Sequence, residues 1–294
     1  MLPERSKFTV TVEVVPPAGP DAESILAKLE ALAALPIDGF SVATNPVAKP
    51  RMSALALCAL IQQRTERPAI LHCTTRDHNR LSIQALLWGA RALGISTVLA
   101  ATGDFVALGD RARTTTVRDV DVFALVHLAR EAGLRTGVVL DPRPESNGLE
   151  REIRRLERKA EAGAEFAVTQ PFYDEARVRA LAEATQRIGI PIVLGILPLR
   201  TARHAEFLHH QVAGIAVPQA VRQQMRQAKD PAAKGAANAR KMLAAARQYL
   251  AGACLMPPFD HFEMLFDILP QDQKDSKSSR GLCAPHQGKD SREW

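Results

Sequence analysis

Short apolar runs alternate with amphipathic stretches along most of this chain. The apolar runs are rich in Val, Ile, Leu and Ala, and they lie at residues 8–15, 38–43, 68–73, 96–101, 135–140, 165–169, 191–196 and 252–256. Between them, apolar residues recur at helical spacing over residues 21–34, 51–65, 77–92, 117–132, 148–162, 174–187, 201–210, 218–227, 231–249 and 260–269. Runs of this length predict strands, and the intervening stretches predict helices.

A strand followed by a helix, repeated over residues 1–270, predicts one α/β domain with the (β/α)8 barrel fold. The strands show no clean alternation of apolar and polar residues, as expected where both faces are buried. An open doubly wound sheet is the main alternative, but no Gly-x-Gly-x-x-Gly follows the first strand. Gly94 and Gly133 fall where two helices should end. The pair 218–227 and 231–249 is predicted to be an insertion with a solvated face.

The last segment, residues 271–294, is rich in Lys, Ser, Asp, Gln and Gly. It has almost no apolar periodicity, so it cannot bury enough surface to offset the entropy of ordering. We predict a disordered tail.

Composition narrows the class of protein. The net charge is +6, but the basic residues are interleaved with Glu on helices, and only two Tyr and two Trp are present. Both features argue against nucleic-acid binding. The four cysteines are far apart without metal-ligand or disulfide spacing, and no apolar run is long enough to cross a membrane. We predict a cytoplasmic protein with reduced thiols, no metal and no membrane contact.

Glu13 is the one ionisable residue inside the first apolar strand, just before Pro16 and Pro17. A carboxyl group buried there would have a raised pKa and could serve as a general acid near neutral pH. The alternative is a solvent-facing Glu on a half-exposed strand.

Polar side chains also follow the other strands, at their carboxyl ends. In a parallel barrel these ends form one mouth, where the chemistry of such folds takes place. The set contains carboxyl groups, but no nucleophile–base–orienter triad and no pair of metal ligands. It therefore favours chemistry in which a cofactor performs the difficult step. Its members are Glu13, Thr44, Asn45, His72, Gly103, Asp104, Asp141 and Gln170.

At these residues the chain resembles the methylenetetrahydrofolate reductase family, over nearly all of residues 7–269. The matching segments are Thr11-Val-Glu-Val-Val-Pro-Pro17, Leu71-His-Cys-Thr-Thr-Arg-Asp77, Ala101-Thr-Gly-Asp104, Lys159-Ala-Glu-Ala-Gly-Ala164, Val168-Thr-Gln-Pro-Phe-Tyr-Asp174 and Gly195-Ile-Leu-Pro198. Ala205-Glu-Phe-Leu-His209 and Met256-Pro-Pro-Phe259 are most similar to the reductase domain of bifunctional homocysteine S-methyltransferase/methylenetetrahydrofolate reductase proteins.

The resemblance implies a (β/α)8 barrel that holds FAD and reduces 5,10-methylenetetrahydrofolate to 5-methyltetrahydrofolate. NADH or NADPH supplies the electrons in a ping-pong scheme on one flavin face. Glu13 matches the general acid that opens the methylene bridge, and Asp104 matches the carboxylate that stabilises the resulting N5 iminium ion. Gln170 matches the amide that binds the pterin, Phe207 the aromatic that stacks on the folate or nicotinamide, and His261 a substrate contact.

For the flavin, the resemblance implies ring and ribityl contacts from Thr44, His72, Thr102, Gly103, Asp104 and Asp141. Glu152, Arg155, Arg158 and Lys159 lie nearly on one helix face, where the family places adenosine and diphosphate contacts. Without the resemblance, the same residues would be interpreted as a surface ladder of salt bridges.

Several residues depart from the family pattern. Thr102 stands where many relatives have Arg, Ala43 where some have a flavin-contacting Thr, and Asp141 where others have Tyr or Asn. His204 and His261 replace an amide and an Arg near the substrate. Two alternatives therefore stay open: a flavin-poor folate-binding or methyl-transfer subunit that works with a partner protein, and a flavin reductase for another one-carbon or amine carrier. The choice of NADH or NADPH and the formation of a homo-oligomer are also open.

Overall fold

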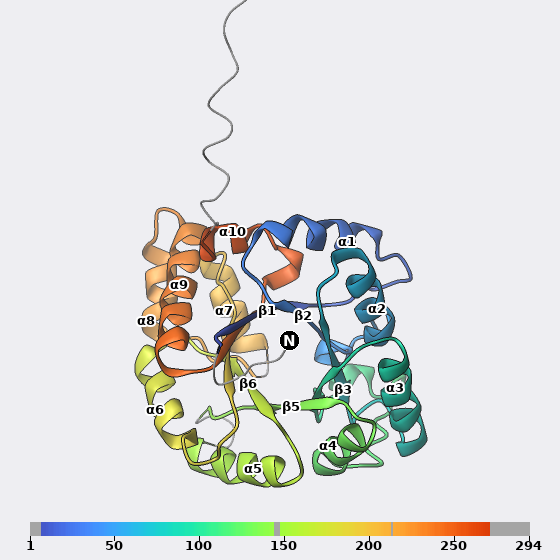
Figure 1. Cartoon of the computed structure of the whole chain (residues 1–294). Coiled ribbons are helices and arrows are strands. Elements are labelled where there is room, and N and C mark those ends of the chain that lie inside the picture. The colour runs from blue at the N-terminus through green and yellow to red at the C-terminus, as the bar shows by residue number, and fades with distance from the viewer. Residues whose placement is uncertain (1–6, 144–147, 213, 271–294) are drawn as a thin grey trace, which may run out of the picture.

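The computed structural model describes residues 7–143, 148–212 and 214–270. Its strands close into one parallel barrel in chain order, with the last strand pairing with the first (Figure 1). This architecture confirms the predicted (β/α)8 barrel. The strands are β1 (Thr9–Val14), β2 (Gly39–Val42), β3 (Ala69–Thr74), β4 (Thr97–Ala101), β5 (Arg135–Leu140), β6 (Phe166–Pro171), β7 (Ile192–Ile196) and β8 (Gly252–Leu255).

Helices surround the barrel and cover its outer face (Figure 1). The α-helices are α1 (Glu23–Glu30), α2 (Ala54–Thr65), α3 (Arg80–Ala92), α4 (Val122–Glu131), α5 (Leu149–Glu161), α6 (Glu175–Thr185), α7 (Ala202–Gln211), α8 (Gln219–Gln227), α9 (Pro231–Tyr249) and α10 (Met264–Ile268). Four short 3₁₀ helices accompany them: η1 (Ala31–Ala34), η2 (Pro46–Ala48), η3 (Leu108–Asp110) and η4 (Pro258–Asp260). Gly94 and Gly133 have φ of 76° and 72°, as expected for residues that end α3 and α4.

Two apolar layers stabilise the barrel. The larger lies between the sheet and the helices, and the smaller fills the barrel interior with Ile70, Leu99, Phe166, Val168, Val193 and Cys254. Gly137 makes room for the interior ring of Phe166, because a methyl group on Gly137 would lie 2.2 Å from the ring. The interior is therefore packed below the mouth.

Helix α4 begins later than its periodicity predicts. Asp121 accepts a hydrogen bond from the N–H of Ala124 (2.8 Å) and so caps a helix that starts at Val122. Residues 102–121 are instead a long connection from β4, interrupted only by η3.

The prediction that the pair 218–227 and 231–249 forms the insertion is wrong for its second member. α9 buries Ala236, Ala239 and Leu243, among others, and packs against α6, α10 and the sheet. It is therefore a helix of the barrel wall. The insertion consists of α7 and α8, which pack on each other around Leu199, Ala205, Leu208, Val217 and Met225.

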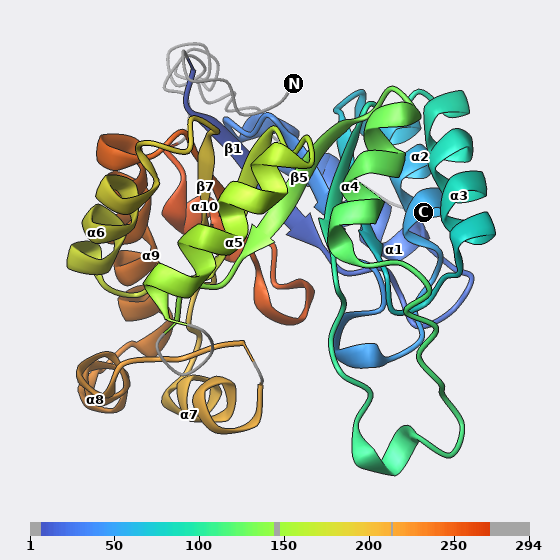
Figure 2. The ribbon, with the colours of Figure 1, turned by 90° about the horizontal axis from the view of Figure 1, so that it is seen from below.

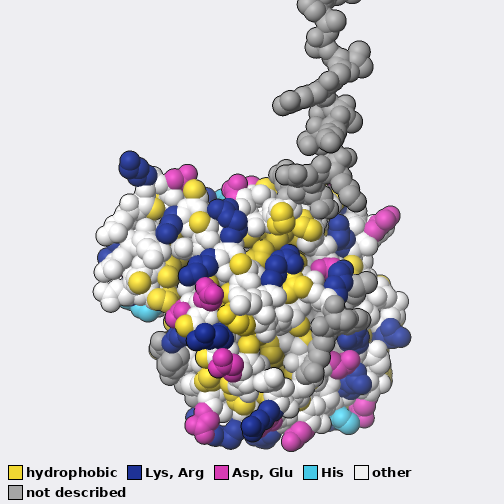
Figure 3. All heavy atoms as spheres, turned by 60° about the vertical axis from the view of Figure 1, so that its left-hand side comes forward, with side chains coloured by type: hydrophobic (Ala, Val, Ile, Leu, Met, Phe, Trp, Pro, Cys, Tyr) yellow, Lys and Arg dark blue, Asp and Glu magenta, His cyan; other side chains and the backbone are white. Residues whose placement is uncertain are grey.

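Two segments project beyond the carboxyl ends of the strands, and both can be followed in Figure 2. One is the α7–α8 pair, and the other, on the far side of the mouth, is the connection from β4 to α4. On the face shown in Figure 3, basic and acidic side chains are interspersed rather than gathered into a basic stripe. Among the described residues, no helix is both long and apolar enough to cross a membrane. The predicted disordered tail, residues 271–294, lies outside the described part of the chain.

Candidate active site

Several side chains that the sequence singles out lie near the carboxyl ends of the first strands. Glu13, near the end of β1, is the neighbour of Ser41 on β2 in the parallel register. His72 follows on β3, and its Nε2 lies 2.7 Å from Ser41 Oγ. The first three strands thus contribute a carboxyl group, a hydroxyl group and an imidazole to one side of the mouth.

Glu13 combines partial solvent access with a strongly perturbed acidity. Burial among the strands and, to a smaller extent, the negative charge of Asp104 together raise the pKa of its carboxyl group to about 7. At neutral pH the protonated form of Glu13 is therefore populated. Such a group can donate a proton at neutral pH, whereas an ordinary carboxyl group cannot.

His72 is held as a neutral imidazole. Burial lowers its pKa to about 4, and its carbonyl oxygen accepts a hydrogen bond from Thr44 Oγ1 (2.5 Å). Below it, Cys254 has a thiol pKa of about 12, raised by burial and then by the charge of Glu13. Both groups are uncharged at neutral pH, so Glu13 is the titrating group of this interior cluster.

Asp104 lies where the chain leaves β4, close enough for its charge to act on Glu13. Its Oδ2 accepts a hydrogen bond from the N–H of Val47 (2.6 Å), in the connection that follows β2. Thr102 and Gly103 precede it, and Gly103 has a φ of 78°. A methyl group on Gly103 would lie 3.0 Å from Arg76 Cβ and 3.2 Å from Thr74 Cβ. Only glycine therefore suits this turn, in both conformation and space.

Asp141 and part of α5 form a charged group beside β5. Asp141 makes a two-pronged ion pair with Arg143, at 2.6 and 2.7 Å. Lys159 is buried and donates a hydrogen bond to the carbonyl oxygen of Val139 (2.6 Å). Burial and, to a smaller extent, the positive charge of Arg155 together lower the pKa of Lys159 to about 8.

The four predicted residues of α5 do not all face the same way. Glu152 and Lys159 are buried, and Arg155 lies 3.5 Å from Glu152 in an ion pair. Arg158 instead packs over the ring of Phe123 on α4, with its guanidinium carbon 4.4 Å from the ring centre. The structure therefore groups Glu152, Arg155 and Lys159 and directs Arg158 away from them.

The three predicted substrate residues come from different segments. Gln170 is half-buried near the end of β6, and its side chain faces Gly214 in the connection between α7 and α8. Phe207 is 46% exposed on α7. His261 follows β8 and pairs with Glu263 at 2.5 Å. Burial, helped by the positive charges of Arg200 and His261, lowers the pKa of His204 to about 4. Arg200 before α7, His204 on α7 and His261 after β8 are therefore near one another.

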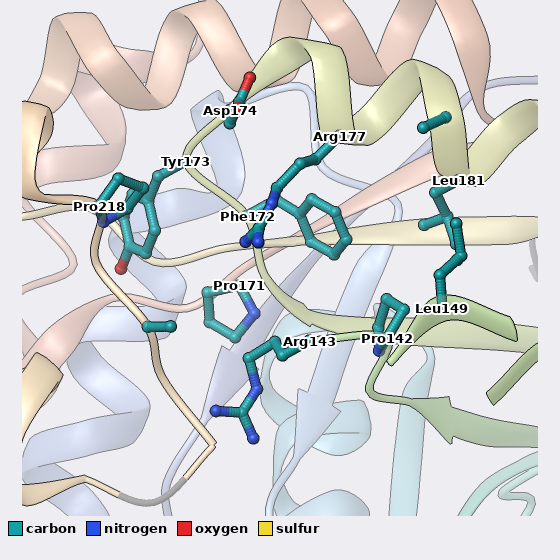
Figure 4. A pocket seen from close by; sticks show the side chains of 12 residues that line it. Pro142, Arg143, Leu149, Pro171, Phe172, Tyr173, Asp174, Arg177, Leu181 and Pro218 are labelled. Atoms are coloured by element: carbon teal, nitrogen blue, oxygen red, sulfur yellow. The ribbon is translucent and has the colours of Figure 1, made fainter. Parts of the chain in front are cut away.

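The clearest hollow among the described residues lies beside the mouth rather than in it. It has a volume of about 660 Å³ including its open side, and it is bounded by the ends of β5 and β6, by α6 and by the segment before α8. Arg143 lies at one edge and Asp174 at the other (Figure 4). None of the predicted site residues lines it.

The sequence analysis missed Ser41, Arg76 and Asp77. Ser41 could have been found from strand parity, because it points inward like Glu13 on the neighbouring strand. Arg76 and Asp77 lie within the segment Leu71–Asp77, but nothing in its pattern shows that an Arg there is buried. Among the described residues, no group of three or more His, Cys, Asp or Glu side chains is placed to hold a metal ion.

Fold and site together define a TIM-barrel protein with a cluster of polar side chains at the carboxyl mouth of its sheet. The chain belongs to the methylenetetrahydrofolate reductase family, whose sequence profile matches residues 1–253.

Similar curated proteins carry the same family name. A 5,10-methylenetetrahydrofolate reductase of Pectobacterium carotovorum subsp. carotovorum is 27% identical over 202 residues, which cover 66% of this chain and 65% of that protein. Methylenetetrahydrofolate reductase 2 of Schizosaccharomyces pombe is 28% identical over 194 residues, 60% of this chain and 30% of that protein. The matched region thus spans less than two thirds of either relative.

Solved structures share the fold at low identity. An uncharacterized protein from Clostridium thermocellum, described as binding two copies of 5-methyl-5,6,7,8-tetrahydrofolic acid, superposes with a TM-score of 0.63 at 13% identity, covering 86% of this chain and 89% of that one. An oxaloacetate acetylhydrolase superposes with a TM-score of 0.53 at 10% identity, covering 88% and 78%. At these identities the likeness establishes the barrel fold alone.

Proposed function

We propose that this protein reduces 5,10-methylenetetrahydrofolate to 5-methyltetrahydrofolate, with FAD as cofactor and NADH or NADPH as the electron source. One observation carries the proposal beyond family membership. Glu13 lies in the mouth with a pKa of about 7, and the charge of Asp104 acts on it there. A proton donor and a nearby anion at one mouth match the two demands of this substrate.

Glu13 would act first. The methylene bridge of the substrate joins two nitrogens, and opening it requires a proton on the nitrogen that leaves. The protonated carboxyl group of Glu13 donates that proton as the carbon–nitrogen bond breaks, and the bonding electrons stay with the leaving nitrogen. The carbon is left as an iminium cation on N5, and Glu13 becomes a carboxylate.

Asp104 and Gln170 would then hold the cation in place. The fixed negative charge of Asp104 stabilises the iminium ion, an effect that can reach several kcal/mol in a site shielded from water. Gln170 offers both a donor and an acceptor to the planar edge of the pterin. Phe207 and His261, on the projecting segments, would contact the remainder of the substrate.

The residues present fit a flavin. Thr44, His72, Thr102 and Gly103 offer polar groups and a glycine turn at the ends of β2 to β4, where a ring could approach the backbone. Arg155 and Lys159 lie close enough for each to oppose the other's charge, and a bound diphosphate would relieve that repulsion. When bound, FAD would take a hydride from NAD(P)H and pass it to the iminium carbon.

The first experiment is to purify the protein and measure its visible absorption and its two half-reactions. We expect a flavin band that bleaches with NADH, and oxidation of the reduced protein by methylenetetrahydrofolate or by menadione. Replacing Glu13 by Gln should lower folate reduction by roughly 100-fold or more, while menadione reduction is retained. Glu183→Gln, an exposed carboxyl on α6, serves as the control and should change neither. Equal loss of both half-reactions in Glu13→Gln would contradict the assigned role.

A second candidate is a folate-binding or methyl-transfer subunit that works without flavin. It is favoured by the side chain of Arg158, which packs over the ring of Phe123 on α4 instead of joining Arg155 and Lys159. Tight tetrahydrofolate binding by a colourless protein that oxidises no NAD(P)H would favour this function over the first.

A further inference from the structure

Arg76 is the largest side chain that is almost completely buried, with 2% of its surface exposed. It follows β3 directly, below the rim of the mouth. Burying a guanidinium group costs several kcal/mol unless its charge and donors are matched. Its partners therefore show what this residue holds together.

The partners of Arg76 come from three successive connections of the barrel. Its Nε and Nη2 bind the two carboxylate oxygens of Asp77, at 2.6 and 2.7 Å. Nη2 also donates to the carbonyl oxygen of Asn45 (3.0 Å), after β2, and Nη1 donates to the carbonyl oxygen of Asp104 (3.2 Å), after β4. One planar group thus joins the segments that follow β2, β3 and β4.

Asp77 extends the same network. Its Oδ2 accepts hydrogen bonds from Asn45 Nδ2 (3.2 Å) and Thr74 Oγ1 (3.3 Å). Burial alone would raise the pKa of Asp77, but the hydrogen bonds and charge of Arg76, with those of Asn45 and Thr74, hold it below its usual value. The carboxylate therefore stays charged, and the guanidinium keeps a fixed counter-charge.

The backbone that these bonds hold is strained. Asn45, Val47 and Ala48 have φ of 41°, 49° and 55°, in the left-handed region that costs about 1 kcal/mol or more for each non-glycine residue. Such a conformation persists only when its surroundings determine it. The N–H of Val47, in this segment, is the donor that binds the Asp104 carboxylate.

We propose that Arg76 is a positioning residue, which fixes the Asp104 carboxylate over the mouth by clamping both the Asp104 backbone and the strained segment that donates to its side chain. The inference rests on the proposed function for its catalytic meaning. Arg76 is too deeply buried to touch a substrate, so it acts through Asp104.

The test is Arg76→Lys, assayed in the flavin-loaded protein. Lysine keeps the charge, but a single ammonium group cannot bridge three segments in one plane. We expect kcat for folate reduction to fall by roughly 10- to 100-fold, as displaced catalytic groups do. KM for folate and the rate of menadione reduction should stay within about twofold, because Arg76 contributes to neither.

Arg67→Lys is the matched control. Arg67 precedes the other end of β3, and it likewise donates to two backbone carbonyls of another connection, Ile37 O and Ala33 O. Both variants should lose some thermal stability, but only Arg76→Lys should lose kcat. Equal kcat loss in both variants, or none in Arg76→Lys, would overturn the inference. Should Arg76→Lys fail to fold, Asp77→Asn, which weakens the same clamp, must show the kcat-selective loss.

Crystal structures separate this inference from the proposed function. If the wild type does not reduce methylenetetrahydrofolate, the proposed function fails. The position of the Asp104 carboxylate can still be compared between the wild type and Arg76→Lys. Catalytic groups must be held within about 0.5 Å of their productive position. A larger shift of the Asp104 carboxylate relative to Glu13 in Arg76→Lys would support the clamp. An unmoved Asp104 that keeps its bond to the Val47 N–H would overturn it.

Discussion

At the scale of single residues, the acidity of Glu13 links the proposed chemistry to stability. The pKa of Glu13 is about 7 in the folded chain, whereas an unperturbed Glu carboxyl group, as in the unfolded chain, has a pKa of 4.5. Between these two pH values the folded protein therefore binds more protons than the unfolded protein. The free energy of unfolding should therefore fall as pH rises from about 4.5 to 7. The full effect of one group shifted this far is about 3 kcal/mol.

Glu13→Gln should remove this dependence. Glutamine has nearly the same shape and does not ionise, so the variant should gain stability relative to the wild type at pH 8 and gain far less at pH 5. Urea unfolding of both proteins at the two pH values measures the difference. The control Glu183→Gln should change the free energy of unfolding by the same small amount at both pH values. A Glu13→Gln effect that is independent of pH would show that the carboxyl group titrates normally.

Lys159 gives a second prediction, for flavin binding. With a pKa of about 8, lowered by burial and by Arg155, Lys159 loses its charge as pH rises through that value. If its charge attracts the diphosphate, the affinity for FAD should weaken roughly tenfold from pH 7 to pH 9. Lys159→Met should bind more weakly at pH 7 and show little change with pH. Quenching of flavin fluorescence measures both, with Lys241→Met on α9 as the control. An unchanged pH dependence in Lys159→Met would place the diphosphate elsewhere.

At the scale of elements, α9 shows how tightly one helix is set against the barrel. A methyl group on Gly235 would lie 1.6 Å from the carbonyl oxygen of Leu199, in the segment after β7. Gly89 on α3 meets only Leu55 Cδ2, at 3.4 Å. Two glycines in helices thus differ in whether the fold requires them.

Replacing each of these two glycines by alanine should change the stability of the protein in opposite directions. Gly235→Ala should destabilise the protein by more than about 2 kcal/mol, because the backbone of Leu199 must move. Gly89→Ala should stabilise it by about 0.5 to 1 kcal/mol, the ordinary gain of alanine over glycine in a helix. Thermal unfolding of the two variants checks both signs. A mild effect of Gly235→Ala would mean that α9 is not seated this closely.

The same elements show what the sequence could and could not predict. All eight strands lie where the apolar runs predict them, because a strand buried on both faces has a strong local pattern. The start of α4 was misplaced because residues 117–121 continue a helical pattern that Asp121 interrupts. The role of α9 was misjudged because alanine and glycine on its buried face give little apolar contrast with its solvated face.

The sequence predicts a residue's place at the mouth where that place follows from the end of a strand alone. Glu13, His72 and Asp104 reach the mouth because the carboxyl ends of parallel strands must converge there. Arg76 was missed because its burial depends on three connections that meet only in the folded chain. Side-chain direction also separates Arg158 from its helix neighbours, and helical spacing alone does not show that it packs on Phe123.

At the scale of the whole molecule, the barrel separates stability from chemistry. The predicted acid, anion and amide lie near or after the carboxyl ends of β1, β4 and β6. The two projections extend from the same end of the sheet (Figure 2). Phe105 and Leu108 on the connection from β4 are 77% and 80% exposed, and Phe207 on α7 is 46% exposed. Apolar side chains on projections beside a polar mouth are suited to contact an entering ligand from above.

A single entrance shared by two substrates would affect the kinetics of the reaction. If NAD(P)H and methylenetetrahydrofolate must both approach the flavin between the same two projections, they cannot be bound together. Each must leave before the other enters, so double-reciprocal plots against folate at several NADH concentrations should be parallel, and a stable folate analogue should compete with NADH. Phe207→Ala should then weaken both substrates, while an exposed apolar residue on the outer helices, such as Trp88 on α3, should affect neither when changed to Ala. Intersecting lines would instead require a second entrance, and the carboxyl mouth would then serve only one of the two substrates.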